Sequence, residues 1–108
     1  MTNNIVTVSR NSSNFLYTII KNVIKNPIIL RRGKKNIAKV IQYSLFNGFN
    51  TVLILSKTTD QNIIKINKLK ININGSDTQY KSNIYLYDLN EHRKIFYNTK
   101  NPKNKKFY

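Results

Sequence analysis

Three segments of the chain have a clear pattern of apolar positions. Residues 5–9 (IVTVS) are β-branched and alternating and precede the turn-forming RNSSN, which predicts a strand followed by a turn. Residues 37–45 carry apolar side chains at helical spacing, and Asn47-Gly48 supplies a C-terminal stop for that helix. Residues 51–55 (TVLIL) form a continuous apolar run of strand length, which indicates a strand that is buried on both faces.

Residues 15–24 fit two interpretations. Their apolar side chains recur at i, i+1, i+4 and i+5, which is typical of a helix, and a serine of RNSSN would cap it. The letters FLYTII also fit the return strand of a hairpin. Asn26-Pro27 ends either element, because the residue before proline is disfavoured in helical conformation.

The remaining segments complete an alternating pattern. Residues 28–30 predict a short strand, and residues 63–73 fit either a second, weaker helix or a strand of alternating isoleucines. Residues 74–83 (NGSDTQYKSN) predict a loop, and residues 84–89 (IYLYDL) predict a last strand. A strand, a helix and another buried strand in succession predict an α/β unit with a right-handed crossover.

Composition restricts the partners of the chain more than any motif does. Its 108 residues include 19 Lys and Arg against 4 Asp and Glu, a formal net charge of +15, which favours a polyanionic partner that releases counterions on binding. We expect no membrane partner, because no apolar run approaches the length of a membrane span. The abundance of 18 Asn, 15 Lys and 16 Ile, all with A/T-rich codons, indicates an A/T-rich genome.

Enzymatic function finds little support in the sequence. The single histidine, His92, lies in a polar stretch, and the four acidic residues form no close pair in an apolar setting. The chain has no cysteine and no glycine-rich phosphate-binding motif. We therefore expect no catalytic residue, no metal site and no cofactor.

Basic side chains gather in three clusters instead. In the first, Gly33 would let the backbone approach a phosphate while the flanking cations hold its oxygens. The second cluster is Lys65, Lys68 and Lys70, and the third is the C-terminal end, where Tyr97, Phe107 and Tyr108 could stack on unpaired bases. Tyr43, Phe46 and Phe49 are expected to pack around the main helix. The candidate RNA-binding residues of the first and third clusters are Arg31, Arg32, Lys34, Lys35, Arg93, Lys94, Lys100, Lys103, Lys105 and Lys106.

Both ends of the chain resemble the universal small-subunit ribosomal protein S-eleven family. NNIVTVS resembles the NNTIVTVTD start of that family, and NGFNTVLILSK is similar to its HGIKTVEVYVKG segment. YLYDLN lies where the family has a strand of the type SIRDVT, and YNTKNPKNKK parallels its basic terminus of the type HNGCRPPKKRR. The resemblance favours FLYTII as the second strand of an N-terminal hairpin.

The resemblance implies a structural constituent of the small ribosomal subunit that does no chemistry. Its partners would be small-subunit rRNA at the platform, neighbouring ribosomal proteins, and mRNA near its exit. The A/T-rich codon use then points to a mitochondrial ribosome, with a plastid as the alternative. The expected fold is a single α/β domain over residues 1–90, with a mixed sheet, an N-terminal hairpin, one long and one short helix, and a basic tail over residues 91–108.

Other classes remain open. SRNSS, RRG and NGFNTVLILSK also resemble the front half of the Brix family of ribosome-assembly factors, and a small Alba-like nucleic-acid-binding protein of β-α-β-α-β-β order is a third option. A structural peptide of an organelle complex, with an amphipathic helix over residues 14–25 lying on a membrane, is an option from a different class. A strand at residues 15–20 paired with residues 5–9 would favour the ribosomal platform family, and a helix there would favour Brix or Alba.

Overall fold

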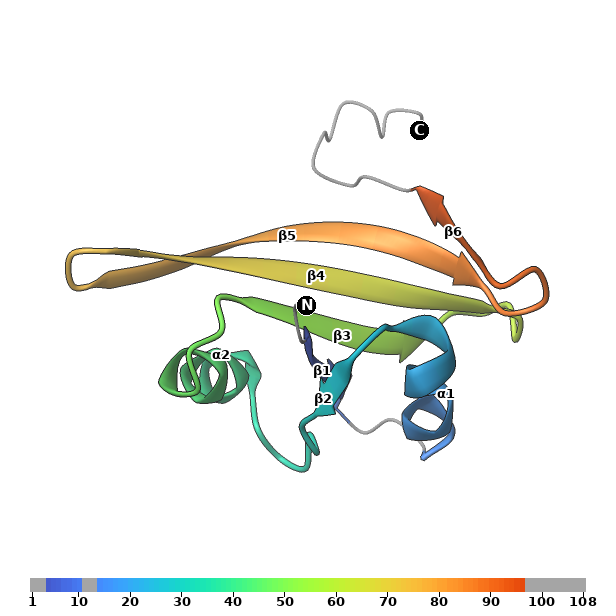
Figure 1. Ribbon diagram of the computed structural model, residues 1–108, viewed down its shortest axis with the longest axis horizontal. Coiled ribbons are helices and arrows are strands. Elements are labelled where there is room, and N and C mark those ends of the chain that lie inside the picture. The colour runs from blue at the N-terminus through green and yellow to red at the C-terminus, as the bar shows by residue number, and fades with distance from the viewer. Residues whose placement is uncertain (1–3, 11–13, 97–108) are drawn as a thin grey trace.

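The chain forms a six-stranded mixed sheet with two helices. A computed structural model describes residues 4–10 and 14–96. The strands lie in the order β2-β1-β3-β4-β5-β6 across the sheet, which curls along its length (Figure 1). The elements along the chain are β1 (Asn4–Val8), α1 (Phe15–Val23), β2 (Pro27–Ile29), α2 (Ile37–Phe46), β3 (Thr51–Lys57), β4 (Ile63–Asn74), β5 (Asp77–Asp88) and β6 (Arg93–Phe96).

Strand directions divide the sheet into two parts. β1 pairs in parallel with both β2 and β3. Helix α1 connects β1 to β2, and helix α2 connects β2 to β3. From β3 onward each strand pairs antiparallel with the next, so β3 to β6 form a meander. The predicted single α/β domain with a mixed sheet is confirmed.

The two helices pack on opposite faces of the sheet. They lie toward opposite ends of the long β4–β5 pair (Figure 1). On β1, Ile5 packs in the apolar cluster under α2, while Val6 and Val8 pack in the cluster under α1. Because successive side chains of a strand point to opposite faces, the central residues of β1 and β3 are buried on both faces of the sheet. This two-sided burial explains the continuous apolar run in β3.

β4 shows how the two helices determine the pattern of one strand. Ile64 and Ile66 face α1, whereas Leu69 and Ile71, one position out of phase, face α2. The apolar face therefore changes in the middle of the strand, where cover passes from one helix to the other. The sequence shows this change as a break in the alternation of isoleucines.

The expected N-terminal hairpin is wrong, because residues 15–23 form helix α1. Both edges of β1 are already occupied by β2 and β3, so no antiparallel return strand can pair with it. Leu16 and Ile20 lie one helical turn apart and are fully buried against the sheet. Asn26 then adopts a left-handed conformation with φ of 50° directly before Pro27, which separates the helix from β2.

Two further expectations need correction. Residues 63–73 form a strand, one of their two interpretations, so the expected short helix does not lie there. The second helix is α1, which has nearly the length of α2, with 9 against 10 residues. Residues 74–83, expected to be a loop, contain only the short turn at Gly75 and the first half of β5. The first half of β5 has polar side chains and so lacks the alternation typical of a strand, because this end of the hairpin extends beyond the helices (Figure 1).

Replacing Ile20 with Ala tests the packing of α1. Because Ile20 is fully buried in the cluster under α1, the truncation should lower the free energy of unfolding by about 2–5 kcal/mol. Urea denaturation measures this difference. Phe15→Ala is the control, since Phe15 is 42% exposed and its loss should cost much less. Equal effects of the two variants would contradict the helix packing.

Candidate nucleic-acid interface

The basic loop after β2 is held against the carboxyl end of β1 by Arg32. Its Nη1 donates to the Val8 carbonyl at 2.8 Å, and its Nε donates to the Lys35 carbonyl at 2.7 Å. The backbone amide of Arg32 donates to the Tyr17 hydroxyl of α1 at 2.8 Å. One residue therefore connects β1, α1 and the loop.

This arrangement corrects the role expected for Arg32. Its side chain is 5% exposed and its guanidinium donors point to backbone carbonyls, so it stabilises the fold instead of facing a ligand. Desolvation by burial lowers the pKa of Arg32, and the positive charge of Arg10 lowers it further while Tyr17 opposes both. Arginine stays charged even so, because its guanidinium is too strong a base to lose its proton in a protein.

The other cations of the loop are accessible. Arg31 is exposed and its guanidinium carbon lies 4.2 Å from the centroid of the Tyr17 ring. Lys34 is exposed beside Gly33, whose φ of 52° allows the tight turn, and the Lys35 ammonium donates to the Arg31 carbonyl at 3.0 Å. A pocket of about 340 Å³ separates the loop from the start of α1. Arg31 and Lys34 can thus reach a phosphate outside the carboxyl end of β1.

A second basic surface lies on the α1 side of the β4–β5 pair, where the sheet extends beyond α1. It consists of Lys68, Lys70 and Lys81, which we call the lysine cluster. Lys70 and Lys81 are directly opposite each other across the strands, and Lys68 lies two positions along β4 on the same face. The uncharged neighbours on this face are the amides Asn72, Gln79 and Asn83. This part of the sheet face is therefore polar and cationic.

No lysine of the cluster forms an ion pair within the described residues. The one ion pair within residues 4–10 and 14–96 joins Arg93 and Glu91, at 2.6 Å. Like charges that face each other across antiparallel strands repel and destabilise the sheet. A bound polyanion would relieve the repulsion between Lys70 and Lys81, and water and salt relieve it only in part.

Aromatic side chains adjoin the lysine cluster. Tyr85 and Tyr87 follow on the same face of β5, and the Lys94 ammonium of β6 lies 4.7 Å from the centroid of the Tyr85 ring. Both tyrosines, Lys68 and Lys94 line a pocket of about 200 Å³ at the C-terminal end of α1. Tyr87 is buried in the cluster under α1, so Tyr85 is the ring of this pair on which an unpaired base could stack while phosphates pair with the lysines.

The structure separates some predicted residues and adds others. Lys65, grouped with Lys68 and Lys70 in the sequence, lies on the opposite face of β4. The loop lies beyond the carboxyl end of β1, whereas Lys70 is level with the amino end, so the two basic surfaces are distinct. Arg93 pairs with Glu91. Lys100, Lys103, Lys105 and Lys106 lie outside the described residues, as do Tyr97, Phe107 and Tyr108.

Sequence reasoning did not identify Lys81 and Tyr85, because they lie in β5, half of which was expected to be a loop. Phe49 packs on the core as predicted, but Phe46 is 90% exposed and Tyr43 is 40% exposed. Within the described ranges no three His, Cys, Asp or Glu residues gather as metal ligands. Neither helix in that part of the chain is long and apolar enough to cross a bilayer.

The fold of this chain also occurs in a solved structure. The crystal structure of a probable ribosomal biogenesis protein from Aeropyrum pernix K1 matches with a TM-score of 0.57 and 14% sequence identity. The match covers 81% of this chain and 48% of that one, so this chain spans about half the length of the protein it resembles. No family model matches the chain, and no curated protein shows significant sequence similarity to it.

Replacing Arg32 with Ala should destabilise the fold. The substitution leaves the Val8 and Lys35 carbonyls without their charged donor, which should lower the free energy of unfolding by about 2 kcal/mol or more. Thermal and urea denaturation measure the loss. Arg31→Ala removes the same charge from an exposed position and should change stability by less than about 1 kcal/mol. If both variants unfolded alike, Arg32 would not be the connection described.

Proposed function

We propose that this chain is an RNA-binding protein that acts in ribosome assembly. The observation that carries the RNA-binding part is the lysine cluster, in which Lys70 and Lys81 face each other on a helix-free part of the sheet. Lysines would pair with phosphates, and the amides of Asn72 and Asn83 would reach base edges. The ring of Tyr85 would support an unpaired base, so the substrate class is single-stranded or locally unpaired RNA.

Two observations favour an assembly factor over a resident protein of the subunit. The helix at residues 15–23 removes the strand on which the platform-protein expectation depended, and it favours the Brix or Alba alternatives. The first six elements follow the β-α-β-α-β-β order of the Alba alternative, but β5 and β6 extend the sheet beyond it. Similarity of fold to a probable ribosomal biogenesis protein supports the Brix alternative. The mitochondrial location that we propose with this function depends on composition alone.

Exchanging two lysines of the cluster tests the RNA surface. Lys70→Gln with Lys81→Gln should weaken binding of a fluorescent single-stranded RNA about tenfold or more at moderate salt. The slope of log affinity against log salt should fall by about 1.4, because each phosphate contact to a single strand contributes about 0.7. Fluorescence anisotropy over a salt series measures both quantities.

A matched double variant controls for net charge. Lys39→Gln with Lys65→Gln removes the same charge from the opposite side of the sheet and should leave most of the RNA affinity intact. The variant of Lys70 and Lys81 should fold at least as stably as the parent chain, because it relieves their repulsion. Equal losses of RNA affinity in both variants would mean that net charge, and not the lysine cluster, binds the RNA.

Sedimentation distinguishes an assembly factor from a resident protein. In gradients of cell extract, a tagged chain should migrate with precursor particles and be absent from mature small subunits after a salt wash. Immunoblotting of the fractions, with a resident ribosomal protein as a marker, gives the measurement. Retention on mature subunits in stoichiometric amounts would instead support a structural constituent of the subunit.

A further inference from the structure

The α2 side of the β4–β5 pair has the opposite character to the lysine cluster. Tyr80, Ile84 and Leu86 alternate along β5 and point to this face. Tyr80 is 48% exposed, and Ile84 and Leu86 are half-buried without belonging to either apolar cluster of the described residues. Ile73, which is directly opposite Thr78, is 63% exposed. The outer strands thus present apolar side chains on a face that α2 does not reach.

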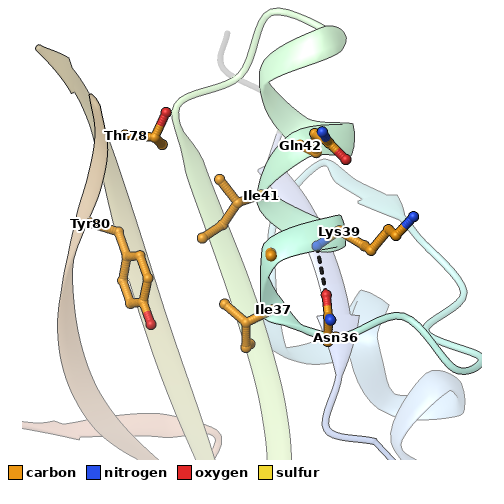
Figure 2. Close-up of a pocket in the computed structure, with 8 residues that line it drawn as sticks. Asn36, Ile37, Lys39, Ile41, Gln42, Thr78 and Tyr80 are labelled. Atoms are coloured by element: carbon orange, nitrogen blue, oxygen red, sulfur yellow. Dashed lines mark hydrogen bonds between the residues drawn. The ribbon is translucent and has the colours of Figure 1, made fainter. Parts of the chain in front are cut away.

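A groove lies where this face meets α2. Ile37 and Ile41 point from the helix toward Thr78 and Tyr80 of β5 (Figure 2). These four residues and the adjoining turns of α2 line a pocket of about 490 Å³. One wall is a helix and the other is the projecting hairpin. The sheet face between them continues toward Ile84 and Leu86.

Positive charge borders this apolar surface. Lys39 lies on α2 among the lining residues, with its ammonium directed away from Thr78 and Tyr80 (Figure 2). Lys65 is directly opposite Leu86 on the same face of the sheet as Tyr80. No acidic residue occurs between positions 31 and 50, so α2 and the loops that flank it carry no negative charge. Asp88, at the far end of this face, accepts from the backbone amides of Asn90 and Glu91.

We propose that this face, defined by Ile73, Tyr80, Ile84, Leu86 and the groove beside α2, is a docking site for an amphipathic helix of a protein partner. Sheet faces in α/β proteins are normally covered by helices, and here a second helix beside α2 would bury the exposed apolar side chains. Acidic residues along the flanks of that helix would pair with Lys39 and Lys65. The matching structure is a chain about twice as long as this one.

Other occupants fit this face less well. A second copy of this chain would bring together two molecules of net charge +15, which repel each other. RNA could use the ring of Tyr80. It would gain little from Ile73, Ile84 and Leu86, because aliphatic side chains neither hydrogen-bond to bases nor offer a planar ring for stacking. The docking site does not depend on the proposed RNA binding, which involves the opposite face.

A designed peptide probes the docking face directly. The probe is a labelled synthetic helix with leucines on one face and glutamates on both flanks, and a peptide of the same composition in scrambled order is its control. The full chain should bind the helix at least about tenfold more tightly than the scrambled peptide, because only the helix presents a continuous apolar face. Anisotropy measures both affinities.

Variants locate the binding. Ile73→Thr with Tyr80→Ser should weaken binding of the helical peptide about tenfold or more, whereas Phe15→Ser, an exposed aromatic of α1, should not change it. Lys39→Gln with Lys65→Gln should weaken peptide binding and reduce its salt dependence. Circular dichroism checks that each variant is folded; Ile73 and Tyr80 are exposed and tolerate the exchange.

Peptide affinity tests the docking site, and RNA affinity tests the lysine cluster on the opposite face. Equal binding of the helical and scrambled peptides, or unchanged peptide affinity in the Ile73 and Tyr80 variant, would overturn the docking site. Loss of RNA affinity in that variant would also overturn it, because this face would then be an RNA surface. The variant of Lys70 and Lys81 should lose RNA affinity and keep its peptide affinity.

Discussion

The structure depends on the burial of β1 and β3 on both faces by two helices at opposite ends of the sheet. Each central strand must supply apolar side chains to both clusters, since its residues alternate between the faces. Where β4 and β5 extend beyond the helices, their side chains need not be apolar on both faces. Both candidate surfaces of the protein occupy these uncovered parts of the sheet.

In the outer part of the sheet, alternation along each strand places basic side chains on one face and apolar side chains on the other. Even-numbered positions of β4 carry Lys68 and Lys70 on the α1 side, while odd-numbered positions carry Ile71 and Ile73 on the α2 side. An RNA strand and a protein helix could therefore occupy the same pair of strands without competing for space. Under the proposed function, the two faces of a single sheet would bring a protein to an RNA site.

Arg32 shows why a basic residue in a basic loop need not bind a ligand. The carbonyl of Val8 at the end of β1 and that of Lys35 in the loop need donors, and a buried guanidinium satisfies both with fixed geometry. The residues beside it in the sequence, Arg31 and Lys34, remain exposed because the turn at Gly33 directs them outward. The conformation of the loop, and not its composition, decides that Arg32 is buried while Arg31 and Lys34 are available to a phosphate.

The sequence by itself determined the α/β class, the helix that begins at residue 37 and the buried strand β3, because local periodicity needs no tertiary context. It left residues 15–24 and 63–73 open, and only the tertiary structure decided them: β1 has parallel partners on both edges, and two helices cover β4 in turn. Register between strands far apart in sequence placed Lys81 opposite Lys70 and Lys65 on the other face. Such pairings depend on contacts between distant residues, which no local pattern encodes.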